Sequence, residues 1–180
     1  MGDVLAKHKK VELIIGKHVD LREVELSDAE FILSLRTDEL KSKFLHKTEN
    51  DLQKQIEYLK NYKTLDNEYY FIIENKKGNP LGTVRLYNLK ENQCTGGSWI
   101  MKSGSTVQEV IEGDLLLQHF VFNILNLENN YFDVRKGNNK VIKFHKMKGA
   151  KEINQDEKNF YFVLNKRDFE KSKDFFSNLL

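Results

Sequence analysis

The chain has 180 residues, of which 39% are hydrophobic and 31% are charged, and its formal net charge at pH 7 is +2. This composition is typical of one globular domain and excludes an intrinsically disordered chain. The small net charge also argues against nucleic acid as a partner, because that function needs a strongly basic face.

The single cysteine and the lack of a long apolar run indicate the cellular compartment and exclude some kinds of site. Cys94 is the only cysteine, which rules out an intramolecular disulfide and a thiolate metal cluster, so we expect no metal. No apolar run approaches the ~20 residues that span a bilayer, and residues 1–10 lack the apolar core of a signal peptide. We therefore expect a cytoplasmic protein with no membrane partner and a loose leader over residues 1–10.

The first half of the chain predicts a hairpin followed by two helices. Apolar and polar positions alternate around Gly16, which indicates strand pairing over residues 11–26. The sequence Ser27-Asp28-Ala29-Glu30 is a capping box, and it predicts that Ser27 caps a helix. A second helix is expected from Asn50 or Asp51 to Tyr62, because apolar residues recur there at helical spacing.

Three consecutive strands are expected next. The segment Asn67–Asn75 is rich in aromatic and β-branched residues, and a turn carrying Pro80 leads to its hairpin partner Leu81–Leu89. Cys94–Met101 gives the third strand. A polar loop then leads to a helix that we predict to begin near Gly113 and to lie inside the domain, because it is apolar nearly all round.

The strand, loop and buried helix of residues 97–127 form a possible anion site. The first four amides of a helix have no partner within the helix, and the helix dipole favours negative charge there. Many α/β domains carry the same motif for structural reasons alone. The rest of the chain predicts a strand over Asn130–Val134, a short helix stopped by Gly149, and strands over Ala150–Ile153 and Asn159–Leu164.

The chain ends in a predicted amphipathic helix over Lys166–Leu179. Its aromatic side belongs either to the core or to the surface of a homodimer. Together these elements predict a single α/β (α+β) domain over residues 1–180.

Two segments resemble the GNAT superfamily of acyl-CoA-dependent N-acetyltransferases. Gln108–Gly113 (QEVIEG) stands in place of that family's Arg/Gln-x-x-Gly-x-Gly/Ala loop, with Ile111 where the middle Gly is usual. Residues 137–150 (GNNKVIKFHKMKGA) resemble the downstream pattern Gly-Asn-x-x-Ala-Ile-x-x-Tyr-x-x-x-Gly-Phe, with His145 in place of Tyr. The resemblance implies a mostly antiparallel sheet of about seven strands flanked by helices. It also implies two splayed central strands that form a cleft for acyl-CoA.

The resemblance further implies that acetyl-CoA is the acyl donor. Backbone groups of Ile100, Met101 and Lys102 would pair with the pantetheine amides. The amides at the start of the buried helix would take the pyrophosphate. The residues assigned to that part of the site are Gln108, Val110, Ile111, Glu112, Gly113 and Asp114. Asn138 either orders its loop, meets the pantetheine or is an ordinary helix cap.

Two residues are predicted to act in catalysis. The backbone N–H of Met101, or of a close neighbour, would stabilise the carbonyl oxygen. His145 would donate or shuttle the proton that the leaving thiolate needs, and the alternative is a core or surface histidine on a Lys-rich helix. No Asp or Glu lies between Gln93 and Met101, so the general base is not identified.

The acceptor is predicted to be a small-molecule amine. Three segments, HFVFNIL, residues 131–150 and NFYFVL, look similar to acetyltransferases of amino sugars in bacterial surface polysaccharides. The resemblance implies a nucleotide-linked amino sugar, which needs cations and aromatic faces. The candidates for binding it are Phe44, His46, Arg85, Tyr87, Trp99 and Asp133. Each has an ordinary structural alternative, such as core packing for Trp99.

Two other functions stay open at this point. One is a protein or peptide N-terminal acetyltransferase. The other is a non-catalytic ligand-binding domain of the same fold, which the Ile111 departure favours.

Overall fold

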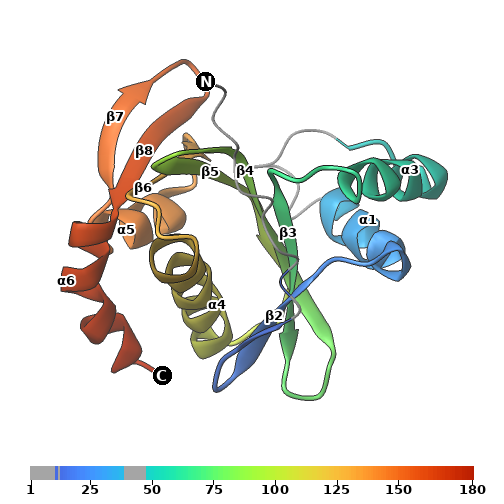
Figure 1. The fold of residues 1–180 in the computed structure, drawn as a ribbon, viewed down its shortest axis with the longest axis horizontal. Helices are drawn as coiled ribbons and strands as arrows, with labels where there is room; N and C mark the ends of the chain where they lie inside the picture. Colours follow the sequence, from blue (N-terminus) through green and yellow to red (C-terminus); the bar gives the residue numbers. More distant parts are fainter. Residues whose placement is uncertain (1–10, 12, 39–47) are drawn as a thin grey trace, which may run out of the picture.

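The computed structural model describes residues 11, 13–38 and 48–180 (Figure 1). One eight-stranded sheet runs through this part of the chain in the order β1-β2-β3-β4-β5-β6-β8-β7. The strands are β1 Leu13–Ile15, β2 Val19–Glu23, β3 Tyr69–Asn75, β4 Pro80–Lys90, β5 Gln93–Met101, β6 Asn129–Arg135, β7 Lys151–Gln155 and β8 Asn159–Asn165. Neighbouring strands are antiparallel except β5 and β6, which run parallel. The predicted fold class is therefore confirmed, with eight strands where about seven were expected.

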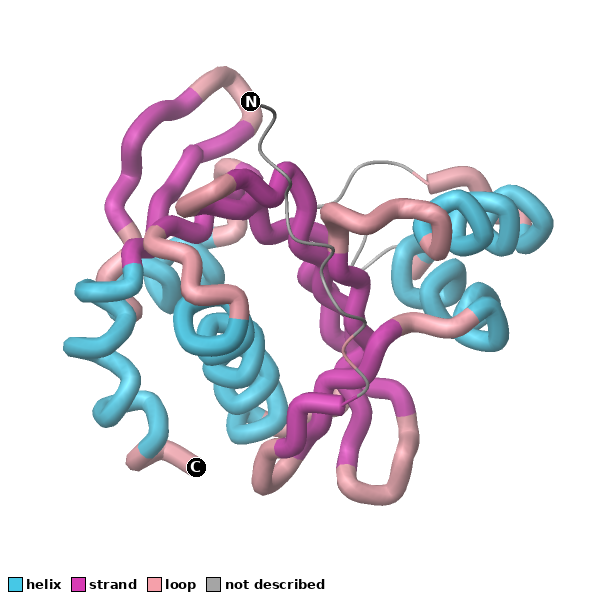
Figure 2. Tube along the Cα trace, viewed as in Figure 1, coloured by secondary structure: helices cyan, strands magenta, loops and turns pink. Residues whose placement is uncertain are grey.

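Helices cover the two faces of the sheet (Figures 1 and 2). One face carries α1 and α3, and the other carries α4, α5 and α6. The helical elements are the 3-10 turn Leu26–Asp28, α1 Ala29–Thr37, α3 Leu52–Tyr62, α4 Val107–His119, the π-helical turn Phe120–Ile124, α5 Asn139–Met147 and α6 Lys166–Ser177. Among the described residues, no helix is both long enough and apolar enough to cross a bilayer.

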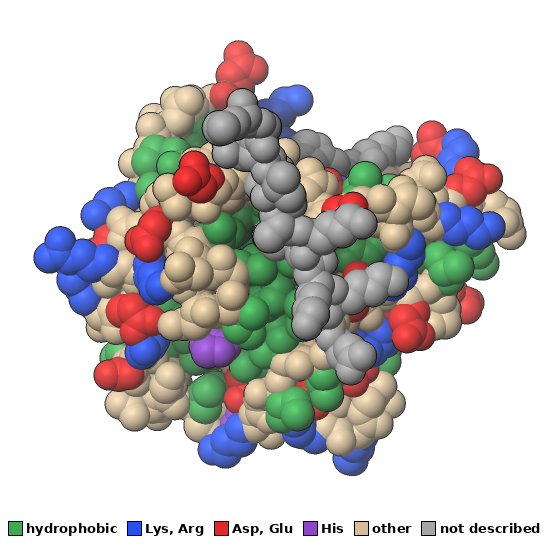
Figure 3. Space-filling model, viewed as in Figure 1, with side chains coloured by type: hydrophobic (Ala, Val, Ile, Leu, Met, Phe, Trp, Pro, Cys, Tyr) green, Lys and Arg blue, Asp and Glu red, His purple; other side chains and the backbone are tan. Residues whose placement is uncertain are grey.

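Alternation along β3 sorts the apolar side chains into two cores. Phe71 and Ile73 point toward α4 and belong to the larger core, while Tyr70 and Ile72 point toward α1 and α3. This is the period of two that any strand imposes. Acidic and basic residues are interspersed on the face drawn in Figure 3, and the buried charged side chains are Asp28, Glu112, Asp114 and Lys148 among the described residues.

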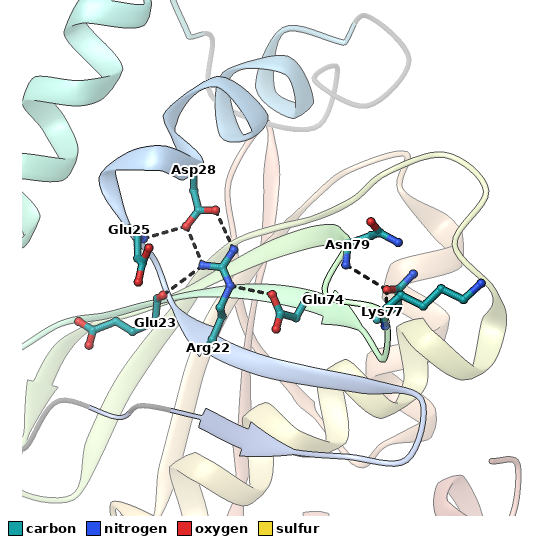
Figure 4. Close-up of polar contacts among 8 residues, drawn as sticks. Arg22, Glu23, Glu25, Asp28, Glu74, Lys77 and Asn79 are labelled. Carbon is teal, nitrogen blue, oxygen red and sulfur yellow. Dashed lines mark hydrogen bonds and ion pairs between the residues drawn. The ribbon is translucent and has the colours of Figure 1, made fainter.

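The predicted cap of the first helix, Ser27, is wrong by one residue, because Asp28 occupies the cap position. Helix α1 begins at Ala29, and the side chain that caps the preceding turn is that of Asp28, which accepts the Glu25 N–H at 2.8 Å. The Asp28 carboxylate is oriented toward β2, because the Arg22 guanidinium donates to both of its oxygens at 2.8 Å (Figure 4). Arg22 also donates to Glu74 at 2.7 Å, so one guanidinium fastens the start of α1 to β2 and β3.

Helix α4 begins at Val107, six residues before the predicted start near Gly113. Thr106 caps it, because the Thr106 hydroxyl accepts the Glu109 N–H at 3.2 Å and the Glu109 carboxylate accepts the Thr106 N–H at 2.7 Å. This reciprocal pair is a capping box. Val110–Gly113 therefore lies within the helix and not in a loop.

The last predicted turn is also displaced. Asn154 and Gln155 belong to β7, and the chain reverses at Asp156, whose Oδ1 accepts the N–H groups of Lys158 and Asn159 at 2.7 and 2.6 Å. An aspartate that binds backbone donors two and three residues ahead stabilises such a turn.

A buried carboxylate joins α4 to the β1–β2 hairpin. Glu112 is 4% exposed, and its oxygens accept the N–H groups of Lys17, His18 and Val19 at 2.7, 2.5 and 2.8 Å. Hydrogen bonds to a charged acceptor are the stronger kind. The Glu112 side chain is therefore committed to holding the hairpin.

Replacing Glu112 with Gln is expected to lower the free energy of unfolding by about 2–4 kcal/mol, because a neutral amide accepts fewer N–H groups and leaves a buried donor unpaired. Urea unfolding measures the change. Glu91→Gln is the matched control, since Glu91 is exposed in the turn after β4. Equal stability of the two variants would contradict the role given to Glu112.

Candidate active site

The central strands β5 and β6 separate after a short common stretch. They pair only over Gln93–Thr95 and Asn129–Tyr131. Beyond these residues β5 pairs with β4 alone, and β6 pairs with β8 alone. The facing edges of β5 and β6 are thus left without each other's hydrogen bonds, as the predicted splay requires.

A β-bulge sits where the strands separate. Thr83 pairs with Ile100 and Arg85 pairs with Gly97, so β5 has one residue more than β4 in this interval. Ser98, within the bulge, has φ of 53°, which is uncommon for a residue other than glycine. The buried Thr83 hydroxyl donates to the Ser98 carbonyl at 2.9 Å and holds the bulge in place.

Three residues follow the bulge, Ile100, Met101 and Lys102. Only Met101 has backbone N–H and C=O groups that point into the gap between β5 and β6. The Lys102 N–H donates to the Leu81 carbonyl at 2.7 Å, and Met101 lies opposite Gly82. Hydrogen-bonded and non-hydrogen-bonded pairs alternate in an antiparallel ladder. The N–H and C=O of Met101 therefore point away from β4, toward the side of β6, whereas Ile100 and Lys102 bind β4.

The residues predicted to hold the pyrophosphate all lie inside α4. The Val110 N–H already donates to the Thr106 carbonyl at 3.1 Å, and Ile111 is buried. A Cβ on Gly113 would lie 3.4 Å from Ile73 and 3.5 Å from Trp99, so this glycine faces the sheet. Asp114 is bound to Lys148. The amides left at the helix start are those of Val107 and Gln108.

Sequence reasoning did not single out Thr106 and Val107. The signal was present in the sequence, because Thr106-x-x-Glu109 is a capping-box pattern directly before an apolar run. This helix start also explains why Ile111 can replace the middle Gly of the family loop. Ile111 lies inside α4, where the backbone is helical and does not require glycine.

His145 lies on the α4 side of the sheet, over β6. Its ring centroid is 4.3 Å from that of Phe132 and 5.5 Å from that of Phe144. Phe132 is the first residue of β6 beyond the stretch that pairs with β5. His145 is therefore placed beside the separation of the two strands.

The His145 imidazole is held in its neutral form. Burial, together with the positive charge of Lys148, lowers its pKa well below 6.5. Its Nδ1 atom is buried and has no hydrogen-bond partner among the described residues. This imidazole is neutral at pH 7 and is a weaker base than a free histidine, and a proton that it takes up is released easily.

The opposite face of the sheet carries a cleft of about 360 Å³ between α1, α3 and strands β3 to β5. Its lining residues are Arg36, Thr48, Glu49, Asp51, Lys54, Gln55, Tyr58, Tyr70, Arg85 and Ser98. Through Ser98 the cleft reaches the bulge. The lining thus combines cations, carboxylates and aromatic rings, and it includes one residue of the β5 bulge.

Arg85 is the most constrained cation of the cleft. It is ion-paired with Glu68, with Nε at 3.1 Å from the Glu68 Oε2, and its guanidinium lies 5.5 Å from the Tyr58 ring centroid and 5.2 Å from that of Tyr87. Burial raises the pKa of Tyr70 to about 12, so that this neighbour stays a neutral phenol.

The remaining predicted residues are dispersed. Tyr87 lies close enough to Asp133 to feel its charge. The pKa of Tyr87 is raised by burial and, to a smaller extent, by the negative charge of Asp133. Trp99 packs into the α4 core, away from the cleft. Asn138 precedes α5 without a capping bond from its side chain. Phe44 and His46 lie outside the described residues.

Known proteins resemble this chain in sequence and in structure. A family model described as "Acetyltransferase (GNAT) domain" matches residues 18–151. The solved structure "Apo FdhC- a nucleotide-linked sugar GNAT" is 35% identical, with a TM-score of 0.81 over 94% of this chain and 97% of that one. No curated protein sequence matches the chain.

Two other solved structures share the fold at lower identity. A putative acetyltransferase from T. thermophilus is 16% identical, with a TM-score of 0.77 over 94% of this chain and 97% of that one. A SpeG spermidine N-acetyltransferase variant from Vibrio cholerae is also 16% identical, with a TM-score of 0.74 over 86% and 98%.

Proposed function

This chain belongs to the GNAT family of acetyltransferases, and we propose that it transfers the acetyl group of acetyl-CoA to a primary amine on a nucleotide-linked amino sugar. The observation that carries the proposal is the arrangement around the β5–β6 separation. His145 lies beside it on the α4 side, and a cleft whose lining includes Arg36, Arg85 and two tyrosines reaches the same bulge from the α1 side. The description of FdhC as a nucleotide-linked sugar GNAT supports the acceptor class.

The chain offers groups that fit the donor at two places. The C=O of Met101, which faces the splay, suits a pantetheine amide in the manner of an added strand. The N–H groups of Val107 and Gln108, at the start of α4, suit the pyrophosphate. When bound, acetyl-CoA supplies the thioester whose C–S bond breaks as the new C–N bond forms.

Two groups of the chain stabilise the carbonyl oxygen and transfer the proton. The Met101 N–H donates a hydrogen bond to the carbonyl oxygen, where negative charge develops. His145, neutral at pH 7, accepts the proton that the amine loses on forming the C–N bond and passes it to the departing sulfur. Because the imidazolium is destabilised by burial and by Lys148, it releases this proton readily.

The cleft on the α1 side would hold the acceptor. Arg36 donates through Nε to the Thr48 hydroxyl at 2.7 Å, which keeps its guanidinium at the cleft wall. Arg36 and Arg85 suit a diphosphate, and Tyr58 offers an aromatic face to a base. Asp133 is exposed near Tyr87 and attracts an ammonium group toward the splay.

The direct test is thiol release from acetyl-CoA with a panel of amines. The panel compares nucleotide-linked amino sugars with the same amino sugars lacking the nucleotide, with spermidine and with short peptides. We expect turnover with the nucleotide-linked sugars and far less with the bare sugars. Preferential turnover of peptides would instead support the N-terminal acetyltransferase.

Replacing Arg85 with Gln is expected to raise the KM for the nucleotide-linked acceptor about 10- to 100-fold, because a charge-assisted hydrogen bond contributes about 1.5–3 kcal/mol. The KM for acetyl-CoA should stay unchanged. Steady-state kinetics with each substrate varied in turn measure both values. Lys60→Gln is the control, because it removes one positive charge at an exposed position of α3. An unchanged acceptor KM in Arg85→Gln would remove Arg85 from the acceptor site.

A ligand-binding domain without turnover is the second candidate, and one observation favours it. The Glu109 carboxylate occupies the Thr106 N–H and places negative charge where a pyrophosphate would enter. Thermal unfolding separates the two functions. Acetyl-CoA at a hundred times its dissociation constant should stabilise a true donor site by ~2.7 kcal/mol. A shift with the nucleotide-linked sugar but none with acetyl-CoA would favour the binding domain.

A further inference from the structure

A fully buried ion pair joins α5 to α4. The Lys148 side chain has 0% exposure, and its Nζ lies 2.6 and 2.7 Å from the two carboxylate oxygens of Asp114, which is 4% exposed. Burying two charges carries a desolvation cost that an ion pair rarely recovers better than apolar residues of the same size. Stability alone therefore does not account for this pair.

The pair continues as a chain of buried amides. Gln118 donates to Asp114 at 3.3 Å, and Asn130 donates to the Gln118 side-chain oxygen at 3.0 Å. Asn130 lies in β6 and pairs with Cys94 of β5 in the short parallel stretch. One connected network thus runs from the end of α5, through α4, to the point where β5 and β6 separate. Such networks specify one arrangement of the elements that they join.

His145 lies one helical turn before Lys148 on the same side of α5. The charge that acts on its imidazole is that of Lys148, which directly follows α5 and is bound to Asp114 of α4. The residue next to His145 in α5, Lys146, pairs with Glu152 of β7. Lys146 is 53% exposed, so its charge is screened by water. Lys148 is shielded from water, and a second positive charge beside it is strongly disfavoured.

We propose that Lys148 is a positioning residue of the acyl-transfer site: bound to Asp114, it fixes α5 against α4 and thereby sets the place and the charged surroundings of the His145 imidazole. The kinetic consequence of this inference rests on the proposed function, but its effect on His145 does not. Lys148 touches no reacting atom in this scheme. It acts through the placement and the charge state of His145.

The test replaces the pair together, as Lys148→Met with Asp114→Leu, so that neither charge is left alone. We expect the double variant to remain folded, with stability equal to or above that of the parent. The pKa of His145, followed by NMR titration of its imidazole, should rise, because burial remains but the Lys148 charge that also lowers it is removed. The acid limb of the kcat/KM profile should move to higher pH with the His145 pKa. We expect kcat to fall about tenfold for a separate reason, because α5 is no longer fixed against α4 and the imidazole loses its place. Lys146→Met is the matched control and should change none of these values.

A second variant protects the test against misfolding of the first. Exchanging the pair, as Lys148→Asp with Asp114→Lys, keeps two opposite charges in the site but puts the negative one on α5. The pKa of His145 should then rise further. An unchanged His145 pKa in both variants would overturn the inference. A raised His145 pKa in a protein that acetylates no amine would support the inference and refute the proposed function.

Discussion

Replacing His145 with Phe is expected to lower kcat by at least about 100-fold, the usual contribution of a positioned acid–base group. The KM for acetyl-CoA should hardly change. Phenylalanine preserves the ring contacts with Phe132 and Phe144 and removes only the nitrogen that accepts the proton. Steady-state rates of thiol release, with saturating acceptor, measure the loss. His119→Gln is the matched control, because His119 is exposed on α4.

The same variant has a pH signature in activity. Burial and Lys148 lower the pKa of His145, so the acid limb of the wild-type kcat/KM profile is expected below pH 6.5. The residual rate of the Phe variant should lack that limb. A variant that keeps full rate at every pH would leave His145 without a chemical role.

The free energy of unfolding should also depend on pH through His145. The folded protein favours neutral His145, so this contribution is fully present above the unfolded pKa of ~6.5 and is lost as pH falls toward the lower folded value. The slope attributable to one such group is at most about 1.4 kcal/mol per pH unit. Urea unfolding across this range should show it in the wild type and not in His145→Phe.

The sequence predicted the fold well because the informative patterns are local. The aromatic and β-branched residues of Asn67–Asn75, the turn at Pro80 and the helical spacing before Tyr62 are each patterns within a few neighbouring residues. The start of α4 differs from the prediction although its signal, Thr106-x-x-Glu109, is local too, because the resemblance to the family loop points instead to Gly113. A strong local signal should have decided the helix start.

The candidate site was less predictable, since contacts distant in the sequence build it. Lys148 looked like one lysine of a Lys-rich helix, and only the folded chain reveals Asp114 beside it, 34 residues away. Glu112 looked like part of an anion loop until the β1–β2 hairpin closed on it. Arg85 was named for its charge, whereas the rings that hold it come from α3 and the same strand. Which face each residue meets depends on the bulge at Ser98, and spacing does not encode it.

The second large effect is expected at Gly82, which lies opposite Met101 in the β4–β5 ladder. A Cβ there would lie 2.5 Å from the Ile100 carbonyl oxygen and 2.5 Å from the Met101 sulfur. Backbone cannot yield as a flexible side chain does, so β4 and β5 must move apart. We expect Gly82→Ala to lower the free energy of unfolding by about 1–3 kcal/mol, the usual cost of overpacking.

The loss of activity in Gly82→Ala should exceed what that destabilisation explains. A displaced Met101 N–H no longer meets the carbonyl oxygen, and the loss of one such donor costs about 100- to 1,000-fold in kcat. Gly78→Ala separates the two effects: Gly78 has φ of 76° with nothing within 4 Å of an added Cβ, so alanine there brings strain of about 1–2 kcal/mol far from the site. Both variants should be less stable than the parent, and only Gly82→Ala should lose kcat under folding conditions. If the two keep equal kcat, the donor to the carbonyl oxygen is a group other than Met101.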